Sequence, residues 1–436
     1  MRFYKKKHNT LNKSKVDFKQ LKSICAHLAK FLLIENQANA YSKSYGEILT
    51  ELEEYLKINN RIKAQASEIV EYLLKSGVLK LKENDRITFR LNGIFEFFIA
   101  QSMSENIDFR DELLDDKVYL SFKNEFEIYS GIKNNDVEFL KTIFEKTKLY
   151  FNNVNSNYHE IGKPELILIS KVSDKNDKNL EEISKKLKPL IPLEDISKDI
   201  INDDVNPIDN LKSEVSVKKT YNIEKLDSEI YERYIAILAR VFKTMDGVND
   251  NDLLSEIIDL LLNTYINFGF YIHEEVENEI LSTSNDDHKD ILEIVTKFLP
   301  FISQVTMSDN IAQHNIENLL INKIEELKKD HKNNQYKLFI LYFILMDIDE
   351  NNILKFTDEL LTLMEVNVLK YSTILKLNYY FNFKGKDNRK IADFLKLKIE
   401  QAYIELKESQ QQLIQREKMA SMGELTAGIA HEIQNP

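Results

Sequence analysis

The chain has 436 residues, of which 43% are hydrophobic and 30% are charged, and its formal net charge is −12 at pH 7. This length is enough for two or three domains with cores of their own, and only 10 glycines and 6 prolines favour helices over sheets. The negative charge argues against a general nucleic-acid-binding protein, because phosphates attract clustered basic side chains. A single cysteine, Cys25, excludes a disulfide framework.

The N-terminal sequence has lysines but no apolar stretch after them, so no signal peptide is predicted. No run approaches the roughly eighteen uninterrupted apolar residues that a membrane helix needs. We therefore predict a cytoplasmic protein without a membrane partner.

The N-terminal module, residues 1–105, begins with three helical segments at 16–35, 45–58 and 64–75. Apolar residues recur in them every three or four positions, which is the period of a helix with one buried face. Gly77 follows the third segment, as a glycine commonly follows the last turn of a helix. Two short β-forming segments then flank the turn residues Glu83-Asn84-Asp85 and predict a hairpin. Three helices and a hairpin predict a winged helix.

After the hairpin comes Phe89-Arg-Leu-Asn-Gly-Ile-Phe-Glu-Phe-Phe-Ile-Ala100. With the preceding helices, it resembles the winged-helix segment that follows the NTPase core in STAND-type signalling ATPases. The resemblance covers about residues 16–105 and implies a regulatory module, with no nucleotide activity because the NTPase core is absent. Arg86 and Arg90 on the wing could contact DNA phosphates, but a solvated strand face is the favoured interpretation.

The middle of the chain divides by composition. Residues 106–170 are predicted as a helical extension. Residues 171–222 are rich in lysine, aspartate, asparagine and serine and predict an acidic linker. Apolar helices return at 223–388, where short polar breaks predict a solenoid-like helical array that acts as a sensor. The run 338–346 reads as a buried helix. The histidines show no ligand spacing, so no metal site is predicted.

The C-terminal part, residues 389–436, begins with a heptad pattern typical of a coiled coil. The pattern predicts a parallel homodimer through residues 395–436, with a seam that a signal can shift. The seam positions are Leu395, Ile399, Ala402, Leu406, Ser409, Leu413, Arg416 and Ala420.

The last residues combine an apolar helical stripe with an imidazole that lies off it. His431 is about 200° around the helix from Ile429, so it points to solvent while the stripe packs inward. A neutral imidazole is a nucleophile near neutral pH and can attack a γ-phosphoryl group. Glu432 can take up the ring proton, and Asn435 lies one turn further on the same face.

The sequence Glu417-Lys-Met-Ala-Ser-Met-Gly-Glu-Leu-Thr-Ala-Gly-Ile-Ala-His-Glu-Ile-Gln-Asn-Pro436 resembles the phosphoacceptor helix of bacterial sensor histidine kinases. The resemblance implies that His431 accepts phosphate from ATP and passes it to an aspartate of a response regulator. It implies that Glu432 supports the kinase step and that Asn435 supports dephosphorylation of the regulator. ATP would be bound by a domain absent from this chain, which should therefore be inactive alone and has no cofactor-binding residues of its own.

The sequence as a whole predicts a mainly α protein: a winged-helix module with a small β-hairpin, a helical array and a C-terminal coiled-coil and phosphoacceptor helix. The favoured function is the front portion of a cytoplasmic sensor histidine kinase that receives an intracellular signal or protein partner. The alternative is a non-enzymatic, STAND-derived interaction or scaffold protein. A third possibility, DNA binding by the winged helix, predicts salt-sensitive retention on duplex DNA.

Overall fold

The computed structural model describes residues 16–34, 41–160, 215, 218–221, 228–282, 288–365, 367–385, 388–402, 404–405 and 408. They belong to two compact units. Unit 1 comprises residues 1–137 and 184–237, and unit 2 comprises residues 138–183 and 238–436. Both are mainly helical, as the composition predicted. Within the described residues, no helix has the length and apolar character needed to cross a membrane.

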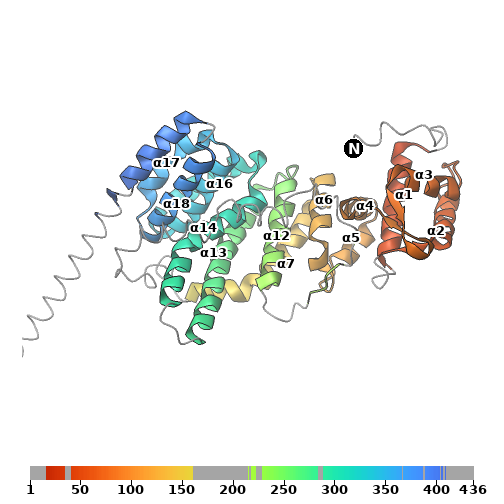
Figure 1. Ribbon diagram of the computed structural model, residues 1–436, viewed down its shortest axis with the longest axis horizontal. Helices are drawn as coiled ribbons and strands as arrows, with labels where there is room; N and C mark the ends of the chain where they lie inside the picture. Colours follow the sequence, from red (N-terminus) through yellow and green to blue (C-terminus); the bar gives the residue numbers. More distant parts are fainter. Residues whose placement is uncertain are drawn as a thin grey trace, which may run out of the picture. The chain divides into compact units, whose positions relative to one another are not determined.

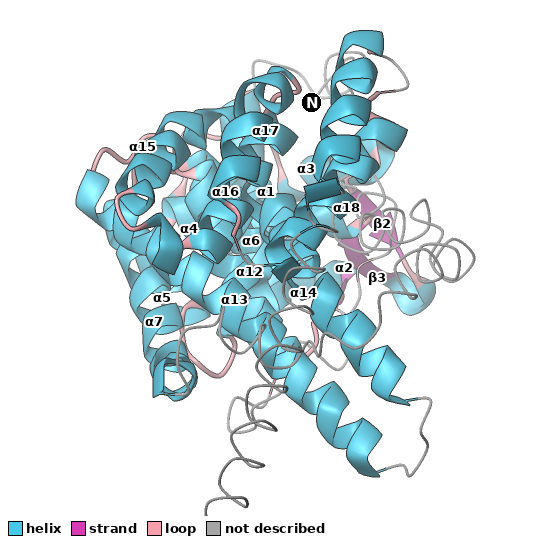
Figure 2. Ribbon diagram, turned by 90° about the vertical axis from the view of Figure 1, so that its left-hand side faces the viewer, coloured by secondary structure: helices cyan, strands magenta, loops and turns pink. Residues whose placement is uncertain are grey.

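Unit 1 begins with a three-stranded antiparallel sheet and three helices (Figures 1 and 2). Its elements are α1 (Phe18–Ile34), β1 (Lys43–Ser44), α2 (Tyr45–Ile58), α3 (Ala66–Ser76), β2 (Leu79–Leu81) and β3 (Arg86–Phe89). The strand order is β1-β3-β2, so the predicted hairpin gains a third strand. This is the element order of a winged helix, and the prediction of that module is confirmed.

Local chemistry explains where these elements start and stop. Ser44 and Glu47 form a reciprocal capping box at the start of α2, because the Ser44 hydroxyl accepts from the Glu47 amide at 3.3 Å and Glu47 Oε2 accepts from the Ser44 amide at 2.8 Å. Gly77 ends α3 in the left-handed conformation with φ 77°, as predicted. Asn84 and Asp85 turn the wing with φ 61° and 55°, which short polar side chains tolerate.

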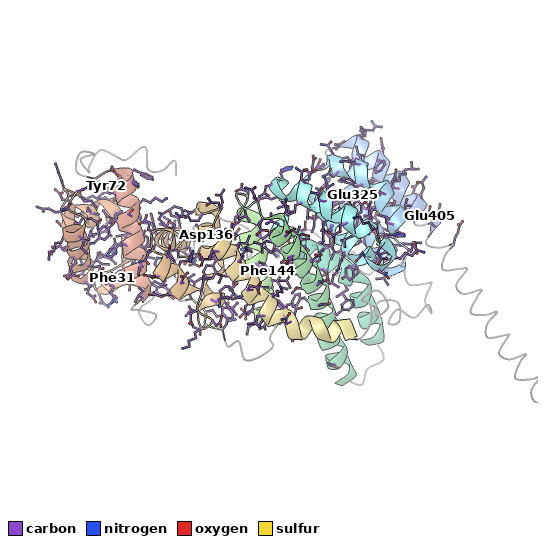
Figure 3. The ribbon with its side chains drawn as sticks, turned by 180° about the vertical axis from the view of Figure 1, so that it is seen from behind. Phe31, Tyr72, Asp136, Phe144, Glu325 and Glu405 are labelled. Carbon is purple, nitrogen blue, oxygen red and sulfur yellow. The ribbon has the colours of Figure 1, made fainter. Side chains whose placement is uncertain are left out.

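Helix α4 (Asn92–Glu105) is the central helix of unit 1. It is apolar around most of its circumference and packs against α1 and against α6 (Lys123–Ile132). Between α4 and α6 lie α5 (Ile107–Leu113) and the short η4 (Tyr119–Phe122). The Asp136 carboxylate (Figure 3) links α5 to α6. Its Oδ2 accepts a hydrogen bond from Arg110 of α5 at 2.9 Å and one from the Tyr129 hydroxyl of α6 at 2.5 Å.

Two buried glutamates lie at the contact of α4 and α6. Glu96 is on α4, and the fully buried Glu125 is on α6. Lys218 compensates them, with its Nζ 2.5 Å from Glu125 Oε1 and 3.8 Å from Glu96 Oε1. Most of the predicted 171–222 linker lies outside the described residues. At its end, residues 215 and 218–221 pack on unit 1.

Unit 2 is an all-helical body in its described part. Its elements are α7 (Val137–Glu160), the end of α12 (Ser228–Thr244), α13 (Asn251–Ser282), α14 (His288–Ile311), η5 (His314–Ile316), α15 (Glu317–Lys328), η6 (His331–Asn333), α16 (Gln335–Ile348), α17 (Asn351–Leu363) and α18 (Asn367–Phe383). Helices α13 and α14 run side by side (Figure 1). The boundaries from α12 to the start of α16 fall at the polar breaks that the sequence predicted, whereas those between α16, α17 and α18 were not predicted.

Helix α16 is the core of unit 2 and packs against α14, α15, α17 and α18. Every residue from 338 to 346 is fully buried, which confirms the predicted core helix. A helix that is apolar on all sides must be surrounded by other helices, because an exposed side would leave apolar area in water.

The buried Glu125 predicts a specific pH dependence of unit 1. Burial raises the pKa of Glu125 to about 7, although the attraction of Lys218 acts in the opposite direction. Folding therefore takes up a proton, and the stability that this provides is present below the ordinary glutamate pKa and is lost as the pH rises through about 7. We expect Glu125→Gln to remove on the order of 3 kcal/mol of this pH dependence.

The measurement is the free energy of unfolding of α4 from hydrogen exchange in urea, at several pH values between about 4.5 and 8. Glu112→Gln, at an exposed position in the same unit, is the control. Equal pH slopes in the wild type and the Glu125 variant would contradict the expectation.

Candidate functional site

The residues predicted for phosphoryl transfer, His431, Glu432 and Asn435, lie outside the described residues. Their roles stay predictions. The structure does describe the helix that leads toward them, which covers residues 389–402.

The 389–402 helix docks on α17 and α18 through one apolar face. Leu395 is fully buried, and Ala402 packs in a cluster with Ile374 of α18. The partly buried residues around this cluster are Leu361, Tyr371 and Ile399. Three positions of the predicted coiled-coil seam, Leu395, Ile399 and Ala402, therefore face the chain's own helices in this structure.

The opposite face of the same helix is open. Leu397 is 52% exposed and Ile404 is 57% exposed, and seven positions separate them. Lys398 forms a 2.7 Å ion pair with Asp358 of α17, but Asp358 is largely exposed, so the pair contributes little to docking. Glu405 follows on the same stretch of chain (Figure 3). Docking thus depends mainly on the buried apolar face.

Helix α18 is itself fixed by a buried polar network around Asp347 of α16. Asp347 Oδ2 accepts from Gln304 at 2.9 Å, from Ser308 at 2.7 Å and from Lys376 at 3.2 Å, while Oδ1 accepts from the Tyr380 hydroxyl at 2.7 Å. These donors come from α14 and α18. One carboxylate therefore joins three helices.

Burial and the neighbouring groups shift the pKa values of Asp347 and Lys376. Burial acts to raise the pKa of Asp347, but Lys376 and the three neutral donors outweigh it and lower that pKa. Burial lowers the pKa of Lys376 despite its pairing with Asp347. The Lys376 ammonium also lies 5.5 Å from the ring centre of Phe301 and 5.2 Å from that of Tyr379. The network fixes α18 under the docked helix, since Ile374 and Lys376 belong to the same turn of α18.

The surface of the winged helix is of mixed charge. On α3, the exposed Glu71 pairs with Lys75 at 3.1 Å. On the wing, Arg86 Nε donates to the Ser42 hydroxyl at 3.0 Å, so this guanidinium is already engaged within the protein. Arg90 is exposed. The helix that would enter a DNA groove in a DNA-binding winged helix thus presents a carboxylate beside its lysine.

Metal binding finds no support in the described residues, where no group of three histidine, cysteine, aspartate or glutamate side chains is suited to hold an ion. The two buried clusters around Glu125 and Asp347 were not predicted from the sequence. A signal was present, because Glu96 interrupts an aromatic run and Asp347 ends the most apolar run of the chain. A charge in such a place needs a partner, but its identity cannot be read from spacing.

One family model matches the chain. It is described as "Novel STAND NTPase 4", and the match covers residues 41–99. This stretch contains the three strands, α2, α3 and the first half of α4. It lies within the region whose resemblance to STAND-type proteins the sequence analysis noted. A search of curated proteins found no match. A search of solved structures also found none.

The docked helix allows a test with two leucines of opposite exposure. Leu395→Asp would bury a carboxylate without a partner and should cost at least about 2 kcal/mol of docking free energy. Leu397→Asp, two residues away on the exposed face, should cost almost none. Hydrogen exchange of the amides in 389–402 measures the difference. Equal exchange in both variants would show that the helix is not held by this face.

Proposed function

We propose that the chain is the signal-receiving part of a signalling protein, and that its STAND-related winged-helix unit and its helical unit work through protein contacts. The observation that carries this proposal is the winged-helix element order over the same stretch that matches the STAND family model. Only the winged-helix stretch supports the relationship, so no nucleotide-dependent activity is assigned to these residues.

A protein-contact role is favoured over DNA binding by the charges of the winged helix. Groove binding draws on unpaired basic side chains that neutralise phosphates. Here Lys75 is paired with Glu71, and Arg86 is bonded to Ser42. A carboxylate on α3 would repel the phosphate backbone.

We therefore expect no specific retention of the chain on duplex DNA at physiological salt. Electrophoretic mobility shift with random and mixed-sequence duplexes, at about 50 mM and 150 mM salt, measures this. Strong retention that falls steeply with salt, and that is lost in Arg86→Gln and Arg90→Gln together, would favour the DNA-binding alternative.

A second candidate function is phosphoacceptance at His431, and its support is the continuous resemblance of residues 417–436 to the phosphoacceptor helix of sensor histidine kinases. In this reaction the imidazole nitrogen attacks the γ-phosphorus of ATP, an N–P bond forms, and the bond to the β-γ bridging oxygen breaks as ADP leaves. Glu432 takes up the ring proton, and Asn435 helps a water attack the phosphorylated aspartate of the response regulator.

The docked helix links the two candidates. In the 389–402 helix, the seam positions Ile399 and Ala402 pack with residues of α17 and α18, and the seam position Leu395 is fully buried. A parallel homodimer that used this seam would need those positions to leave the helical unit. A signal received by unit 2 can thus act by changing the docking equilibrium, which shifts the population of chains able to pair.

The phosphoacceptor candidate is tested by incubating the chain with the isolated ATP-binding domain of a sensor histidine kinase and radiolabelled ATP. We expect a label that is lost in acid and retained in base, as for a phosphoamide, and that disappears in His431→Gln. His314→Gln, at a histidine in η5, is the control. An unchanged label in His431→Gln would leave the non-enzymatic interaction protein as the function.

A further inference from the structure

A short segment that precedes α12 in the sequence packs on unit 1. Its described members are residues 215 and 218–221, and they have no helical or strand structure of their own. Val215 is buried, and the Lys218 side chain is only 13% exposed. Lysine is rarely buried without a partner, so this segment must be bound by specific groups.

The Lys218 side chain enters a site made by α4 and α6. Its ammonium contacts Glu125 at 2.5 Å and Glu96 at 3.8 Å, and it lies 5.4 Å from the ring centre of Phe122. Two amides, from Asn92 at 2.8 Å and Asn124 at 3.1 Å, donate to Glu96 Oε1. Glu96 is thus also held by two amides, and Lys218 lies close to both carboxylates.

Unit 1 also forms hydrogen bonds with the backbone of the segment. The Lys218 amide donates to the Tyr41 hydroxyl at 3.1 Å, and the Ser121 hydroxyl donates to the Lys219 carbonyl at 2.8 Å. Further on, the Arg233 guanidinium lies 4.6 Å from the ring centre of Tyr221. Backbone bonds combined with a pocket for one side chain are the usual means of binding an extended peptide.

We propose that residues 218–221 form a releasable strap, bound in cis to a lysine-recognition site composed of Glu96, Glu125 and Phe122. In its described residues, the strap is held by one buried ion pair and a few hydrogen bonds. Its opening therefore needs less free energy than the unfolding of unit 1.

Two adjacent lysines separate this proposal from a general effect of charge. Lys218 is buried in the site, while Lys219 is 61% exposed and pairs with the exposed Glu229. In the full chain, Lys218→Gln is expected to speed amide exchange in 218–221 by at least about tenfold, because a broken buried pair is costly. Lys219→Gln should leave that exchange unchanged.

Mass-spectrometric hydrogen exchange measures the amide protection of the strap and of the core of unit 1 in one experiment. The proposal requires that α1 and α4 keep their protection in Lys218→Gln. Loss of protection throughout unit 1 would show that the segment is an inseparable part of the core and would overturn the proposal. Equal effects of the two lysine variants would overturn it too.

A second measurement tests the recognition site directly. A fluorescent peptide of residues 213–223 should bind the Lys218→Gln chain, whose own strap is weakened, and should bind the wild type at least about tenfold more weakly because the site is occupied. The matched peptide with glutamine at position 218 should not bind. Adding Glu125→Gln to the chain should abolish binding of the lysine peptide. Equal anisotropy changes with both peptides would contradict lysine recognition.

Discussion

The structure depends on ion pairs that compensate the charges of buried carboxylates. Each unit is built around a helix that is apolar on nearly all sides, α4 in unit 1 and α16 in unit 2, and each helix carries one carboxylate at its packed surface, Glu96 or Asp347. An unpaired carboxylate there would cost several kcal/mol. Lys218 and Lys376 supply the compensating charges from segments distant in sequence. Apolar packing assembles the helices, and these pairs determine which segments complete each unit.

The ion pairs of Lys376 and Lys218 hold different kinds of segment in place. Lys376 lies on a regular helix close to aromatic rings, and its pair with Asp347 joins α18 to α16. Lys218 lies among described residues that form neither helix nor strand. The first pair gives a rigid surface on which the 389–402 helix docks. The second gives a contact that a competing ligand or a change of charge can break.

Much of the fold could be predicted from the sequence because helical periodicity, turn residues and polar breaks are local signals. The winged helix, the helix ends from α12 to the start of α16 and the buried run at 338–346 all follow from such signals. The strand β1 has only two residues and no period, so it could not be found. The heptad pattern at 395–402 predicted an apolar face correctly, but periodicity does not say what covers that face, and in this structure α17 and α18 do. The clusters of Glu125 and Asp347 depend on contacts distant in sequence.

The burial of Cys25 has a practical consequence for labelling experiments on this protein. Cys25 is completely buried in α1, and burial raises the pKa of its thiol, so the reactive thiolate is scarce. Maleimide and iodoacetamide reagents will leave it unmodified while unit 1 is folded. A thiol introduced on a surface of either unit will therefore carry a spin label or a fluorophore at a single known position, with no need to remove the native sulfur.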